Sequence, residues 1–246
     1  MIARWRRAGL LIPTLMTLVM LPVLIALGAW QLQRMHWKED LIARLAAART
    51  AEPVSLLDVW ARYKARENVE YTRVKVTGTF DHGSERHLYA PNTQSQGWDV
   101  FTVLAAPEGR VYVNRGWVPD KLKDPVARAE GQFAEAVTIT GLVRLPEVKS
   151  AFTAHDDAKG NRWFHRDPAA FTAAEGPPAG DVAAVAPFSI DAEPQPANPG
   201  GWPKASATEI RVANRHLEYV VTWWGLAATL VVVFFLFARK RLRDTP

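Results

Sequence analysis

Two long apolar stretches lie near the ends of this chain, and a longer, more polar segment separates them. Residues 8–33 and 219–238 contain no Asp, Glu, Lys or Arg. A helix needs roughly 20 apolar residues to cross the hydrocarbon core of a membrane. The pattern therefore predicts two transmembrane helices, at residues 10–30 and 216–238.

Helical spacing continues past the first apolar stretch. Trp37, Leu41 and Leu45 follow one another at i, i+4 and i+8, the spacing of one face of a helix. We therefore expect the first helix to leave the membrane and continue for two or three turns. A short amphipathic helix is predicted next, at residues 56–65.

From Tyr71 the hydrophobic period changes to two. Apolar and polar residues alternate between Arg73 and Phe80, which is typical of a half-buried strand. Further strand-like runs are residues 87–90, 98–105, 111–118 and 137–145, with weaker ones at 163–166 and 188–191. Close turns, few helices and no strand–helix alternation predict an antiparallel β-rich domain, barrel-like and of α+β class, flanked by the two spans. With its helical N-terminal extension this domain covers residues 31–215.

Charge indicates how the chain crosses the membrane. The formal net charge is +5, but the two terminal tails alone carry +6, because Asp244 offsets one of seven basic residues: Arg4, Arg6, Arg7, Arg239, Lys240, Arg241 and Arg243. The segment between them is close to neutral, so no nucleic-acid partner is expected. Lys and Arg collect in short cytoplasmic tails. Residues 1–9 and 239–246 are therefore predicted to be cytoplasmic tails, and the central domain to be periplasmic in a bacterial inner membrane, in contact with lipid.

The first apolar stretch also admits a second interpretation, as a cleaved signal peptide. Its basic start and small residues near Gly28 are compatible with one. Its apolar run, however, exceeds the 7–15 residues of a signal-peptide core. A retained membrane anchor is the better interpretation.

Catalytic chemistry has little support in this sequence. The chain has no cysteine, which excludes disulfides, Cys-ligated zinc, covalent c-type haem and thiolate copper sites. No nucleophile elbow or catalytic-triad signature is present. We therefore expect a protein that is not an enzyme.

Arg115-Gly116-Trp117 follows a predicted strand and allows two interpretations. Glycine permits close backbone approach, and the indole offers a surface for stacking. Arg115 and Trp117 could bind a cofactor by clamping a propionate or packing on a ring. The structural alternative, favoured by the spacing, places Trp117 in the core with Arg115 in a salt bridge.

His216 stands where the second apolar stretch begins. Neutral imidazole is a common axial ligand of haem iron. Tyr219 and Trp223 are i, i+4 neighbours and share a helix face with His216, where they offer flat apolar surface. The alternative is an interfacial histidine bonded to a backbone carbonyl. His216 is thus a candidate iron ligand, with Tyr219 and Trp223 as candidate cofactor-binding residues.

Taken together, these motifs resemble the surfeit-locus protein one family over nearly the whole chain. The matching motifs are Gly28-Ala29-Trp30-Gln31 with Arg34, Trp37 and Lys38, then Glu70-Tyr71 to Phe80, Val113 to Pro119, Asn161 with Trp163, Ile190-Asp191, and Asn214 with His216, Tyr219 and Trp223. Arg215 replaces an asparagine common in relatives, and residues 152–157 lack a Pro and an Asn expected there.

The resemblance implies an assembly factor for the haem–copper cytochrome c oxidase. It further implies transient binding of haem a, with His216 as ligand, and delivery of the haem to oxidase subunit I. Haem a synthase is a second candidate partner. Two alternatives remain: a membrane scaffold that stabilises subunit I without touching haem, and a copper carrier, which the absence of thiolates disfavours.

Overall fold

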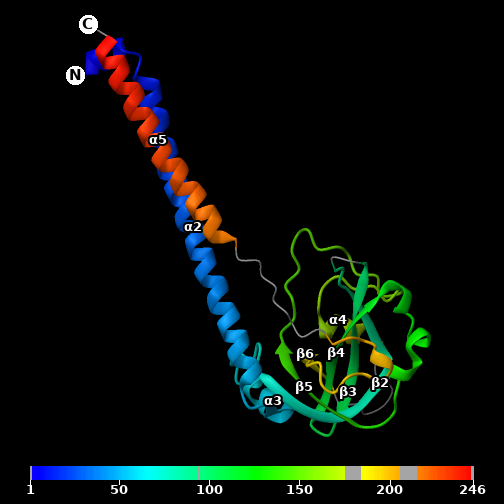
Figure 1. Cartoon of the computed structure of the whole chain (residues 1–246). Coiled ribbons are helices and arrows are strands. Elements are labelled where there is room, and N and C mark those ends of the chain that lie inside the picture. The colour runs from blue at the N-terminus through cyan, green and yellow to red at the C-terminus, as the bar shows by residue number, and fades with distance from the viewer. Residues whose placement is uncertain (1, 93–94, 175–183, 206–214, 245–246) are drawn as a thin grey trace. The chain divides into compact units, whose positions relative to one another are not determined.

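The computed structural model describes residues 2–92, 95–174, 184–205 and 215–244. The chain divides into two compact units, residues 1–44 with 210–246 and residues 45–209. The first unit is helical and the second is built on a β-sheet (Figure 1).

The helical unit contains α1 (Ile2–Arg7), most of α2 (Leu11–Thr50) and α5 (His216–Asp244). Figure 1 shows α2 and α5 side by side, with both chain ends at the same end of the pair. Both helices are long and apolar enough to cross a membrane, which indicates a membrane protein. The predicted continuation of the first helix is confirmed, and it extends as far as Thr50.

The two long helices pack along a seam of small and apolar side chains. Near the chain termini, Leu10 and Ala238 are buried together with Ala8. Further along, a Cβ atom on Gly28 would lie 2.2 Å from the Trp224 ring, so glycine is required for this close approach. Gly225 on α5, by contrast, faces open space.

The β unit is a six-stranded sheet. Its strands are β1 (Val54–Ser55), β2 (Arg73–Tyr89), β3 (Gly97–Ala106), β4 (Gly109–Pro119), β5 (Val137–Arg144) and β6 (Val185–Ala192). They are hydrogen-bonded in the order β1-β2-β3-β4-β6-β5, and β5 also pairs with β2. The β1–β2 and β4–β6 pairs are parallel, so the sheet is mixed, not antiparallel as predicted.

Strand β2 joins two runs that the sequence pattern separated. Its register with β3 shifts between Asp81 and Arg86. At this irregularity the Ser84 hydroxyl donates to the Asp81 carbonyl and accepts the Val103 N–H at 2.8 Å. A side chain thus replaces a ladder bond, and the strand continues through the bulge. The weak run at residues 163–166 is not a strand and contributes only a bridge from Trp163 to Leu88.

Short helices cover and connect this sheet. They are α3 (Leu56–Lys64), α4 (Pro168–Ala173) and the 3-10 segments η1 (Asp120–Leu122), η2 (Pro125–Gly131) and η3 (Pro199–Gly201). A capping box between Ser55 and Asp58 starts α3, which buries Leu56 and Val59 in the main core of the domain. The predicted amphipathic helix is confirmed.

Candidate functional site

His216 lies at the first position of α5 and contacts α2 through a single polar pair. Its Nδ1 is 2.6 Å from Oε1 of Gln31. An amide oxygen only accepts hydrogen bonds, so Nδ1 carries the proton and donates it. The lone pair of the neutral ring is then on Nε2.

Two polar atoms on this face of α5 have no partner in the described part of the chain. They are Nε2 of His216 and Nε1 of Trp223, and both are buried. Leaving a buried polar group unpaired costs about 1–3 kcal/mol. This stretch of α5 therefore holds unused hydrogen-bonding capacity at the half-buried His216 and Trp223 side chains.

The surroundings of His216 differ on its two sides. Tyr219 is 51% exposed, so it presents its ring outward rather than into the seam. Arg215 pairs with Glu218 at 3.0 Å. On α2, Lys38 and Arg34 bring positive charge close enough to interact electrostatically with the imidazole. Asn214, the neighbouring family residue, lies outside the described residues.

The chemistry of His216 fits an axial ligand of haem iron. A ligating histidine almost always donates its other ring N–H to an acceptor, which fixes the tautomer and raises the basicity of the ligand. Gln31 provides such an acceptor. Because Nε2 is buried, an iron atom reaches it only when neighbouring side chains move.

Arg115 and Trp117 belong to the other compact unit, the β domain. The Arg115 side chain is buried, and its guanidinium lies 4.6 Å from the Phe80 ring and 5.6 Å from the Phe133 ring. It donates to the Gly131 carbonyl at 2.5 Å and to Asn198 Oδ1 at 3.1 Å. Burial lowers the pKa of Arg115 to about 10. These contacts are cation–π and carbonyl contacts rather than the salt bridge that the structural interpretation expected.

The cavity beside Arg115 is too small for a macrocycle. Its volume is about 30 Å³, whereas ligand pockets typically have 300–1,000 Å³. Trp117 donates its Nε1–H to the Ala90 carbonyl at 2.7 Å. A role of Arg115 and Trp117 in cofactor binding stays a prediction, and their observed contacts are structural.

The glycine between them brings a distant segment onto β4. Gly116 has φ +123°, and a Cβ there would lie 2.1 Å from the Lys204 carbonyl oxygen. Trp117 and Lys204 exchange backbone hydrogen bonds of 2.8 and 3.0 Å. The Asn198 amide bonds the Arg115 carbonyl as well. The motif therefore fixes residues 198–204 to the domain, which confirms the predicted close backbone approach.

A buried ionic cluster in the β domain was not predicted. Glu85 of β2 accepts hydrogen bonds from both terminal nitrogens of Arg128 and lies 2.7 Å from His87 Nε2. Burial raises the pKa of Glu85, but the hydrogen bonds from His87 and Arg128 outweigh it and lower the pKa to about 2. The cluster fastens η2 to β2. Arg128 is 41 residues from His87 and 43 residues from Glu85, so no local motif indicates the cluster.

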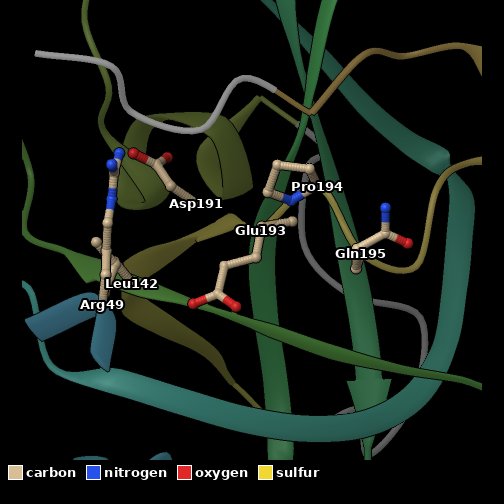
Figure 2. A pocket seen from close by; sticks show the side chains of 7 residues that line it. Arg49, Leu142, Asp191, Glu193, Pro194 and Gln195 are labelled. Atoms are coloured by element: carbon tan, nitrogen blue, oxygen red, sulfur yellow. The ribbon is translucent and has the colours of Figure 1, made fainter. Parts of the chain in front are cut away.

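A pocket that was not predicted also lies in the β domain. It has a volume of about 310 Å³, and its lining residues are Arg49, Leu142, Asp191, Ala192, Glu193, Pro194 and Gln195. Figure 2 shows Arg49 and Asp191 pointing toward each other at one side, with Glu193 turned away from them.

The carboxylates of this pocket already have cationic partners. Glu193 forms a two-bond pair with Arg73, at 2.8 and 2.9 Å. Asp191 lies 2.9 Å from Arg144 and 3.5 Å from Arg166. Because these charges are paired, the pocket offers less unused binding capacity than the face around His216.

The comparisons with known proteins agree with the motifs of the chain. The model of the SURF1 family matches residues 18–228. Surfeit locus protein 1 of Homo sapiens is 36% identical over 248 residues, which cover 93% of this chain and 78% of the relative. Surfeit locus protein 1 of Gallus gallus is 34% identical over 98% of this chain and 77% of its own length. A SURF1-like protein of Monosiga brevicollis is 35% identical over 89% of this chain. Gln31, Arg115 and His216 all fall within the matched region, and the chain belongs to the SURF1 family.

Proposed function

We propose that this protein assists the assembly of cytochrome c oxidase by binding haem a transiently through His216 and passing it to oxidase subunit I. Membership of the SURF1 family supports this proposal, because the resemblance to that family implies an assembly factor for this oxidase. Haem a synthase is the proposed donor of the haem. The proposal is one of binding and transfer, with no catalytic step.

The observation that carries the proposal is the state of the His216 imidazole. Its Nδ1 is engaged by Gln31, while Nε2 is buried and has no partner in the described residues. A neutral nitrogen with a free lone pair is what a haem iron requires of an axial histidine. Trp223 and Tyr219 would supply aromatic surface to a bound haem, and Arg34 and Lys38 of α2 would supply positive charge for its propionates.

We further propose a bacterial inner membrane as the location, with both termini cytoplasmic and residues 31–215 periplasmic. The basic residues at both ends support this orientation, because Lys and Arg collect on the cytoplasmic side. A haem ligand at the start of α5 would then lie close to the periplasmic side of the membrane.

The test is the substitution His216→Ala in the full-length protein, purified in detergent from cells that make haem a. Loss of the axial bond should weaken haem a affinity by about 3 kcal/mol, roughly a hundred-fold in Kd. The protein should still accumulate in the membrane, because the imidazole makes one described hydrogen bond. Cells that carry the variant should assemble less oxidase.

The matched control is His36→Ala on α2, whose side chain is 62% exposed and pairs with Glu39 at 3.4 Å. It should leave haem affinity and the absorption spectrum unchanged. If His216→Ala binds haem a with the spectrum and affinity of the unmodified protein, His216 is not the ligand. The scaffold that stabilises subunit I without haem would then be the better interpretation.

A further inference from the structure

We propose that Gln31 is a positioning residue for the His216 ligand: its side-chain amide holds the imidazole in the tautomer and orientation that present Nε2 to iron. This inference rests on the proposed function. Gln31 and His216 are 185 residues apart in the chain, and their side chains meet at 2.6 Å across the helix pair.

The pair contains a donor and an acceptor with fixed roles. A neutral imidazole exchanges its proton between two nitrogens, and only the unprotonated nitrogen can ligate a metal. Gln31 Oε1 favours the tautomer with hydrogen on Nδ1. In that tautomer the lone pair is on Nε2, the nitrogen that has no partner among the described residues.

The position of Gln31 on α2 supports a specific role. Along α2, Leu21, Leu24, Gly28, Gln31 and Met35 follow one another in steps of three and four, and each is buried or half-buried. Leu27, Ala29 and Leu32 beside them are half-buried as well. Gln31 is thus a polar residue in an otherwise apolar or small-residue seam. Between membrane helices such a residue is expected to hydrogen-bond across the interface.

The alternative is a purely structural role for the hydrogen bond between Gln31 and His216. A buried polar pair can fix the register of two helices without any ligand. That role requires a hydrogen bond between the helices but makes no demand on Nε2. The reduction potential of a bound haem separates the two roles. An acceptor bonded to the other ring nitrogen of an axial histidine changes the basicity of that ligand, and the potential changes with it.

The experiment compares two substitutions of Gln31 in the full-length protein in detergent, loaded with haem a. Gln31→Leu removes the acceptor, and we expect haem a to bind 10–100-fold more weakly, the range typical for loss of such a partner. Gln31→Glu keeps an acceptor and makes it stronger. It should retain affinity and lower the reduction potential of the bound haem relative to the unmodified protein. Gln33→Leu, at an exposed position of α2, is the matched control and should change neither quantity.

Several outcomes would overturn the inference. If His216→Ala loses haem a but Gln31→Leu binds it with unchanged affinity and spectrum, His216 remains the ligand and Gln31 does not position it. If Gln31→Leu fails to accumulate, Gln31→Glu decides, and an unchanged reduction potential contradicts the inference. If His216→Ala itself binds normally, the proposed function fails first.

Discussion

His87 and His216 resemble each other locally and differ in what surrounds them. Each ring has one nitrogen in a hydrogen bond of 2.6–2.7 Å and the other buried with no partner in the described chain. His87 is bonded to a carboxylate that also binds Arg128, inside the β domain. His216 is bonded to a neutral amide between two helices.

The difference concerns which nitrogen is free and how firmly the ring is held. His87 presents Nδ1, the nitrogen next to its own backbone, and sits on strand β2 within a charged cluster. His216 presents Nε2, the outermost nitrogen of the ring, at the first residue of a helix. Both free nitrogens are buried, so the surroundings of each ring separate the two residues. His87 is held in an ionic cluster with Glu85 and Arg128, and we interpret it as a structural residue.

The largest expected effect tests the structural side of this comparison. Arg128→Met leaves the Glu85 carboxylate buried without its two-bond partner, and breaking such a buried pair costs about 3–5 kcal/mol. Thermal unfolding of the full-length protein in detergent, followed by tryptophan fluorescence, should show the loss. Haem a affinity should not change.

The control for Arg128→Met is Arg162→Met. Arg162 pairs with Asp157 at 2.7 Å, but the two side chains are 56% and 38% exposed. Exposed pairs of this kind contribute about 0–1 kcal/mol. Equal losses from the two variants would show that the cluster around His87 does not hold the domain together.

An acid titration probes the same cluster with a somewhat smaller effect. The native pKa of Glu85 is about 2, below its usual 4.5. Its contribution is therefore complete above about pH 4.5 and is lost as the pH falls toward 2, by about 3 kcal/mol in all. Unfolding measured from pH 5 to 2 should show this loss in the unmodified protein. Glu85→Gln should lack that component, and parallel curves for the two proteins would contradict the assignment.

The smallest expected effect lies in the helical unit that holds His216. Gly28→Ala places a Cβ against the Trp224 ring and should weaken the packing of α2 on α5 by about 1 kcal/mol, a typical cost of overpacking. Gly225→Ala faces open space and serves as the control. Titration with a denaturing detergent, followed by far-UV circular dichroism, measures both. If both variants behave alike, the α2–α5 contact at Gly28 is not the one described.

Much of the fold could be predicted from local sequence patterns. The two apolar helices, helix α3 and strands β3 to β6 follow from hydrophobic periods that span a few residues. The parallel β1–β2 and β4–β6 pairs could not be predicted, because pairing between distant strands leaves no local signal. Strand β2 looked like two strands because its bulge interrupts the alternation. The Ser84 hydroxyl accepts a hydrogen bond from the Val103 N–H of β3 there, and in the sequence this serine looks the same as a serine in a loop.

The candidate site was also predictable only where it leaves a local pattern in the sequence. His216 stands out because a titratable residue begins an apolar run, and Trp223 follows at helical spacing. Gln31 was noted as part of a motif, but its partner is 185 residues away. Arg115 was expected in a salt bridge, and it contacts aromatic faces and carbonyl oxygens instead, because Phe133 and Asn198 come from other parts of the chain.

The steps of three and four along α2 also fix how α2 is rotated about its own axis relative to α5. Seven residues make almost two full turns of a helix, so positions seven apart stay on one side. Gly28 and Gln31 are three residues apart on that side, and they meet Trp224 and His216, eight residues apart on α5. One residue inserted between Gly28 and Gln31 would turn the glutamine by about 100° away from its histidine. The contact between Gln31 and His216 therefore depends on the number of residues that separate Gln31 from Gly28 as much as on the identity of the two side chains.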